Sequence, residues 1–133
     1  MNARPQAWFQ QAQDDLGVAK LVCANGFNAQ ACYFASQAAE KALKGLILEL
    51  GAEPPHTHVL AELIKYLKRL GCDVNGFDAL PLRSLSRLAA TSMYPMDATP
   101  PADLFEPADA NGAIATATAV IELLQAMDHF STN

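Results

Sequence analysis

The segment from residue 28 to residue 50 constrains the fold most, because its apolar residues repeat with the period of an α-helix for about six turns. The residues expected on its buried face are Cys32, Ala35, Ala39, Leu43, Leu46 and Leu50. Gly51 follows and supplies a helix stop. The segment is rich in alanine, which permits close approach of neighbouring helices. The sequence therefore predicts a long helix with one buried face.

Four further segments have helical patterns. Helix signals at their ends include Asn25-Gly26 and Gly71 as stops, Thr57 as an N-cap and Pro107 in a first turn. In the first segment Trp8, Ala12, Asp15, Ala19 and Val22 follow the helical period, which places Asp15 in the apolar stripe. The expected helices cover Pro5 to Ala24, Asn28 to Leu50, His58 to Leu70, Leu80 to Ala90 and Pro107 to Phe130.

The fold class follows from this pattern. The chain shows no alternation typical of strands, no hairpin signal and no internal repeat. A length of 133 residues fits one domain with one core. The sequence thus predicts a single all-α domain over residues 1–133, an antiparallel up-and-down helical bundle of four long helices plus a short helix.

Composition narrows the classes of function. The net charge of −5 argues against tight binding of a nucleic-acid backbone. Hydrophobic residues make up 51% of the chain and charged residues 17%, so we expect apolar surface that a homodimer would cover. Three widely spaced cysteines indicate a reducing compartment, and polar residues interrupt the longest uncharged stretch, residues 21–39. A cytoplasmic protein without a membrane segment is expected.

A compact polar row lies on the long second helix. Gln37, Glu40, Lys41 and Lys44 occupy positions i, i+3, i+4 and i+7, and Glu40 precedes Lys44 in the favourable order for an ion pair. One interpretation is a solvated helix face. The other is that the row borders a cleft or dimer seam, where Lys41 and Lys44 bind a phosphate or pair with the carboxylate of Asp15. A structural pair of Asp15 with Lys44 is the specific expectation.

Motifs of metal or nucleophilic catalysis are missing from the sequence. His56 and His58 lie close together, but His129 is the only other histidine and no cysteine cluster completes a zinc site. A phosphate-binding glycine loop, a nucleophile elbow and an H-E-x-x-H motif are also absent. We therefore predict no metal, no cofactor and no local catalytic motif. His58 is expected to make a structural hydrogen bond at a helix start or to line a ligand site.

The chain resembles the HEPN family of small helical domains. The likeness spans nearly the whole chain and is most specific at Gln37 to Lys44; its other parts are Trp8, Asp15-Leu16, Ala19, Pro55 to Leu60, Leu63 and Tyr94-Pro95. The resemblance implies a dimeric helical bundle linked to nucleotide binding or to a toxin–antitoxin pair with a nucleotidyltransferase partner. It suggests a nucleotide or anion site at Lys41, Lys44, His58 and Tyr94.

Two departures from the family pattern bear on activity. Ribonucleases of the family carry an arginine followed, after four to six residues, by a histidine; none of the four arginines, Arg4, Arg69, Arg83 and Arg87, has that histidine. The family segment Ala-Arg-Tyr-Pro reads Ser92-Met93-Tyr94-Pro95, so Met93 replaces the arginine that would best bind an anion.

Three functions remain open at this point. The first is a non-catalytic dimeric binding or regulatory subunit for a nucleotide or a nucleotidyltransferase. The second is a metal-independent ribonuclease toxin whose active groups, such as His58 with Arg83 or Arg87, are not contiguous in sequence. The third is a purely structural interaction module. Convergence of Lys41, Lys44 and His58 in a cleft would favour the first, a His–Arg pair across a dimer axis the second, and a closed apolar seam the third.

Overall fold

The computed structural model describes residues 2–127, and over this range the chain is helical without strands. The class predicted from the sequence, an all-α bundle, is confirmed. None of the helices in the described range is both long and apolar enough to cross a membrane. The elements are α1 (Ala3–Ala24), α2 (Asn28–Glu49), α3 (Leu60–Arg69), α4 (Asn75–Asp78), α5 (Leu82–Ser92), the 3-10 helix η1 (Pro101–Asp103) and α6 (Pro107–Gln125).

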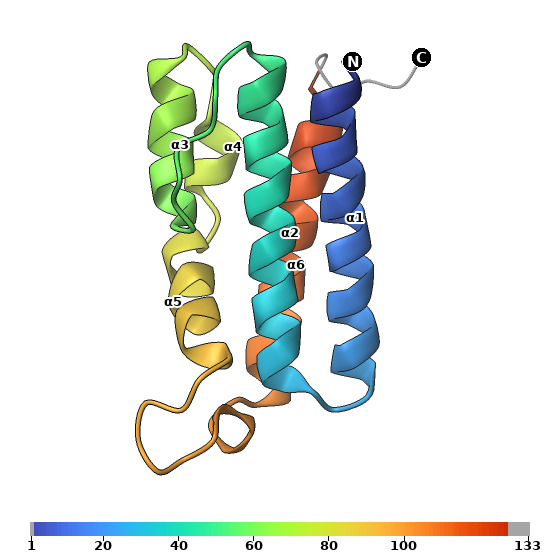
Figure 1. The fold of residues 1–133 in the computed structure, drawn as a ribbon, viewed down its shortest axis with the longest axis vertical. Coiled ribbons are helices and arrows are strands. Elements are labelled where there is room, and N and C mark those ends of the chain that lie inside the picture. The colour runs from blue at the N-terminus through green and yellow to red at the C-terminus, as the bar shows by residue number, and fades with distance from the viewer. Residues whose placement is uncertain (1, 128–133) are drawn as a thin grey trace.

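Helix α2 forms the centre of the bundle (Figure 1). It packs antiparallel to α1 on one side, against α6 behind it, and against α3 and α5 on its other side. The connection after α2 runs back along the bundle, so α3 points the same way as α2 (Figure 1). Helix α5 continues below the start of α3, and together they form one wall of the bundle.

The core confirms the buried face predicted for the second helix except at Leu50, which is half-buried at the C-cap. Cys32, Ala35, Ala39, Leu43 and Leu46 of α2 are fully buried, and leucines of α3 and α6 pack against them. Small residues allow α1 to approach α2 closely. A Cβ atom placed on Gly45 would lie 3.3 Å from Cβ of Trp8, so the helix surfaces touch at this position.

Three glycines end helices as the sequence predicted. Gly26, Gly51 and Gly71 have φ values of 86°, 88° and 87°, a left-handed conformation that costs other residues free energy. After each glycine, the next backbone N–H donates to a carbonyl five residues earlier, at 2.9, 3.2 and 3.0 Å. This is the hydrogen-bond pattern of a Schellman motif, and it satisfies carbonyls at the helix ends.

Several predicted details need correction. Helix α3 begins at Leu60 rather than His58, and its N-cap is Val59 rather than the expected Thr57. The Thr57 hydroxyl instead accepts the Val59 N–H at 3.1 Å ahead of the helix. Helix α5 is displaced by two residues from the expected range. Helix α6 ends at Gln125, whereas the expected end at Phe130 lies outside the described residues. The sequence pattern did not indicate the short helices α4 and η1.

The buried stripe of α1 also differs from the expected one. Ala12, Asp15 and Ala19 are buried as predicted, but Trp8 is only half-buried. Phe9 and Leu16 are buried instead. The helix is therefore rotated so that these two side chains enter the core while the indole covers its edge.

Candidate functional site

The polar row of α2 divides into two clusters. In the first, the Lys41 ammonium contacts Oδ2 of Asp15 on α1 at 2.5 Å. Oδ1 of the same carboxylate accepts a hydrogen bond from Gln11 at 3.0 Å. The side chain of Asp15 is 7% exposed and that of Lys41 27%, so this ion pair lies at the edge of the α1–α2 seam.

The second cluster faces α3. The Lys44 ammonium donates to Oε2 of Glu40 at 3.0 Å, and both side chains are buried. Both carboxylate oxygens of Glu40 also contact Nδ1 of His58, at 3.0 and 3.2 Å. The imidazole is 85% exposed, so Glu40 connects a buried ammonium to a ring at the surface. The predicted hydrogen bond of His58 near the start of a helix is present.

The expected pair of Asp15 with Lys44 is wrong. Asp15 pairs with Lys41, and Lys44 pairs with Glu40 in the i,i+4 arrangement. The reason is geometric: residues 40 and 44 lie on the same face of α2, while residue 41 is rotated by about 100° toward α1. The two lysines therefore reach different neighbouring helices.

Pairing changes the electrostatics of the predicted anion site. Each of the two ammonium groups has a carboxylate partner within hydrogen-bond distance. The charges of two cations and two carboxylates cancel, so the two lysines offer an approaching anion no surplus positive charge. An anion would have to displace Asp15 or Glu40, which leaves a nearly buried carboxylate without its cation, at a high cost in free energy.

Tyr94 lies away from these clusters. Its ring is 77% exposed and lines a separate hollow of about 350 Å³ between the end of α5, the following loop and the start of α6. That hollow contains neither lysine of the row and no histidine. The four residues suggested for a nucleotide or anion site therefore fall into three groups, namely Lys41 with Asp15, Lys44 with His58, and Tyr94 alone.

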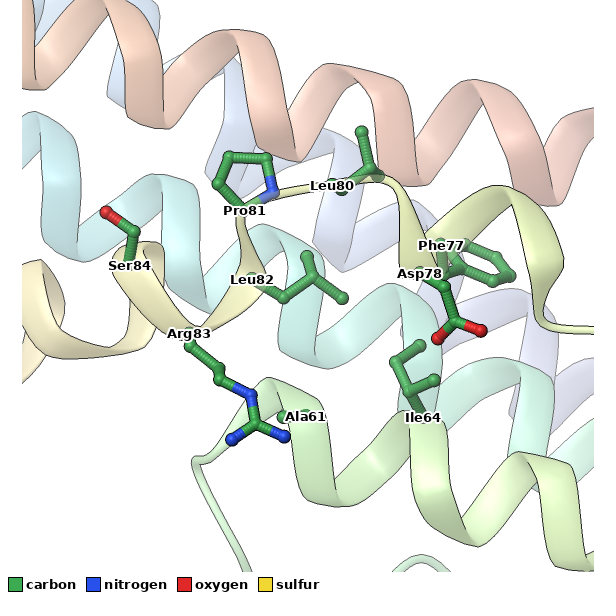
Figure 2. Close-up of a pocket in the computed structure, with 9 residues that line it drawn as sticks. All are labelled: Ala61, Ile64, Phe77, Asp78, Leu80, Pro81, Leu82, Arg83 and Ser84. Atoms are coloured by element: carbon green, nitrogen blue, oxygen red, sulfur yellow. The ribbon is translucent and has the colours of Figure 1, made fainter.

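Neither arginine of the ribonuclease alternative belongs to the His58 cluster. Arg83 lines a hollow between α3 and the segment joining α4 to α5, and His58 is not among the residues that surround it (Figure 2). Arg87 is exposed one turn further along α5. The only link from α5 to the start of α3 among the described side-chain hydrogen bonds is from the Leu60 N–H to the Ser86 hydroxyl, at 3.1 Å.

Sequence reasoning missed two features of this region. The contact between Glu40 and His58 joins residues 18 positions apart on different elements, and no local pattern signals such a pair. The hollow beside Arg83 was missed because its walls come from α3, α4 and α5. Basic residues at 83 and 87 were visible in the sequence, but their surroundings depend on the packing of these helices.

The other candidates for chemistry in residues 2–127 are metal-ligating side chains and thiols. No group of three or more His, Cys, Asp or Glu side chains in that range is arranged to hold a metal ion. Burial raises the pKa of the Cys32 thiol to about 12, and the nearby charges of Asp109 and Cys23 act in the same direction. The thiolate is the nucleophile, so Cys32 is unreactive near neutral pH.

Comparison with known proteins identifies the family. No curated protein matches the chain. Among solved structures, TT1696 from Thermus thermophilus is 29% identical with a TM-score of 0.81, covering 94% of this chain and 98% of that one. ST0689, described as an archaeal HEPN homologue, is 24% identical with a TM-score of 0.70, covering 94% and 97%. At this identity, the likeness to ST0689 is evidence for the fold only. The HEPN domain model matches residues 5–127, so this chain belongs to the HEPN domain family.

Proposed function

We propose that this protein is a non-catalytic, dimeric binding subunit whose activity is to bind proteins rather than to transform a substrate. The observation that carries the proposal is a group of exposed apolar side chains at one end of the bundle. We call it the apolar end; its residues are Phe27, Met93, Tyr94, Met96 and Leu104.

The exposure of these side chains is high for apolar groups. Tyr94 is 77% exposed, Met96 78% and Leu104 58%. They belong to the connection between α5 and α6, which lies at the same end of the bundle as the α1–α2 turn that carries Phe27 (Figure 1). Apolar side chains grouped in this way are typical of protein–protein contact surfaces, and methionine and aromatic residues are enriched there.

The polar row supports binding of protein over binding of nucleotide. Lys41 and Lys44, the cations expected to hold phosphate, are already paired with carboxylates. The apolar end also lacks an arginine at position 93. A second copy of the chain is the proposed occupant of the apolar end, and a nucleotidyltransferase is the class of further partner that the family resemblance implies.

Sedimentation equilibrium at micromolar concentration tests the proposal. We expect twice the chain mass of 14.2 kDa. The double variant Met96→Asp with Leu104→Asp should sediment as a monomer while keeping its helical circular dichroism. Val59→Asp is the matched control, because Val59 is 42% exposed but belongs to the connection before α3. A wild-type monomer at high concentration would contradict the proposed dimer.

Incubation with RNA tests the non-catalytic part. We expect no cleavage at a rate typical of a dedicated ribonuclease, since no arginine has the spaced histidine. Robust cleavage without metal that is lost in His58→Ala would favour the ribonuclease toxin instead. Cleavage that persists in His58→Ala and is removed by further purification would identify a contaminant.

A further inference from the structure

The hollow beside Arg83 has the size and composition of a small-molecule site. Its volume is about 440 Å³, within the usual range of roughly 300–1,000 Å³ for ligand pockets. Figure 2 shows its position between α3 on one side and the segment from α4 to the first turn of α5 on the other. The lining residues are Ala61, Ile64, Phe77, Asp78, Leu80, Pro81, Leu82, Arg83 and Ser84.

The apolar walls of the hollow belong to the core. Ile64, Phe77 and Leu82 are 6%, 1% and 5% exposed, so packing behind them fixes their positions. Ala61 contributes only a methyl group on the α3 side, which leaves room between the two walls. A site with such walls is formed before a ligand arrives, so a ligand would lose little free energy to ordering the protein.

Two opposite charges stand apart at the hollow. The guanidinium of Arg83 reaches toward Ala61, while the carboxylate of Asp78 lies beside Ile64 (Figure 2). Among the described residues no ion pair or hydrogen bond joins Arg83 to any side chain, although the chain has a net charge of −5. A guanidinium binds carboxylates with two parallel hydrogen bonds, and the adjoining apolar surface strengthens such a contact by limiting water.

We propose that this hollow binds a small monocarboxylate with a compact apolar body, aliphatic or aromatic. The carboxylate pairs with Arg83 at one end, and the apolar body covers Ile64 and Leu82. Asp78 at the other end repels a second negative charge, so the site selects against ligands with several anionic groups, nucleoside triphosphates included. The proposal concerns a ligand site and does not depend on the protein-binding function above.

Titration of the labelled full chain with 3-phenylpropionate, followed by two-dimensional NMR, tests the site. We expect saturable shifts for amides of residues 61–64 and 77–84. Arg83→Gln should weaken the affinity by about tenfold or more, the effect of losing a charge-assisted hydrogen bond. Arg87→Gln is the matched control, because Arg87 is exposed on the same helix but does not line the hollow. The affinity of the Arg87→Gln protein for 3-phenylpropionate should stay within about twofold of wild type.

Two further measurements separate the contribution of the ligand's charge from that of its apolar body. The neutral amide 3-phenylpropanamide should bind about tenfold more weakly than the acid to the wild type, and equally to wild type and Arg83→Gln. Asp78→Asn should tighten carboxylate binding, since it removes a repulsive charge. Equal loss in Arg83→Gln and Arg87→Gln, shifts confined to another surface, or no saturable shift at millimolar ligand would each overturn the proposal. Melting curves confirm that every variant is folded.

Discussion

The carboxylate of Asp15 on α1 lies 2.5 Å from the ammonium of Lys41 on α2, at the seam between the two longest helices. Only 7% of the Asp15 side chain is exposed, so its carboxylate depends on partners within the protein. The side-chain amide of Gln11 donates a hydrogen bond to the other carboxylate oxygen, Oδ1. The carboxylate of Asp15 is tolerated in the apolar stripe of α1 because two side chains bind it: Gln11, one turn earlier on α1, and Lys41 on α2.

Replacing Asp15 by Ala should lower the free energy of unfolding by about 1–3 kcal/mol, since it leaves Lys41, whose side chain is 27% exposed, at the seam without a counter-charge. Urea unfolding measured by circular dichroism gives the change. Asp14→Ala is the matched control, because Asp14 is the exposed neighbour on the same helix. A loss within about 0.5 kcal/mol for both variants would mean that Asp15 behaves as a surface residue.

In the Glu40 cluster, replacing the carboxylate should reduce stability much more than replacing the imidazole that contacts it. Glu40→Ala should destabilise the fold by about 3 kcal/mol or more, because Lys44 would stay buried without a partner. His58→Ala should cost less than about 1 kcal/mol, because the imidazole is 85% exposed and its contact resembles a surface ion pair. Both values come from the same unfolding measurement. Equal losses would indicate that His58, rather than Lys44, is the main partner of the carboxylate.

Periodicity made the fold class and most helix ends predictable. Glycines 26, 51 and 71 end helices as expected, because a left-handed residue after a helix is a local requirement that sequence records directly. The Glu40–Lys44 pair was visible for the same reason, since residues four apart on a helix are neighbours. The rotation of α1 was less predictable, because the period fits both Trp8 and Phe9 as members of a buried stripe.

The pairing of side chains in the candidate site could not be predicted from the local sequence pattern. Whether Lys41 or Lys44 meets Asp15 depends on how α1 and α2 are rotated against each other, because the two lysines differ by only about 60° around the helix axis. The parallel course of α2 and α3 depends on the long connection between them (Figure 1). That course brings His58 to Glu40, a contact between segments that carry no shared sequence signal. The walls of the hollow beside Arg83 likewise come from three different helices.

Two glycines inside helices should respond differently to substitution, because only one of them faces a neighbouring helix. A Cβ atom added to Gly17 on α1 would have no atom within 4 Å, so Gly17→Ala should stabilise the fold by about 0.5–1 kcal/mol through helix propensity. A Cβ atom added to Gly45 would lie 3.3 Å from Cβ of Trp8 and 3.4 Å from the Pro5 carbonyl oxygen. Gly45→Leu should therefore cost about 2 kcal/mol or more by forcing α1 from α2.

Thermal and urea unfolding of both glycine variants provide the measurement. Gly17→Leu is the size-matched control for Gly45→Leu, since it adds the same side chain at an exposed position. A Gly45→Leu protein as stable as Gly17→Leu would show that the α1–α2 contact can open without cost. Gly45→Ala should gain less than Gly17→Ala, because its added methyl group lies 3.3 Å from Cβ of Trp8, a contact tighter than usual.

The buried thiol of Cys32 predicts a loss of stability in alkali. Its pKa is about 12 in the folded protein, mainly because burial disfavours the thiolate, against an ordinary value of 9.0. Between these two values the unfolded chain has released the proton and the folded chain has kept it. Unfolding then releases a proton, so the free energy of unfolding falls as pH rises above about 9 and is unaffected by this group below that pH.

Urea unfolding at a series of pH values from neutral to about pH 11 measures this effect. The difference in stability between wild type and Cys32→Ala should be constant below about pH 9 and should then shrink, with a slope that approaches about 1.4 kcal/mol per pH unit for one proton. Cys23→Ala is the control, because the Cys23 thiol is half-buried and contacts Asn111 near the surface.

Iodoacetamide labelling of the folded protein gives an independent check. It should label Cys23 well before the buried Cys32, since only the thiolate reacts. Rapid labelling of Cys32 without unfolding would show that the α2 core opens to solvent at this position.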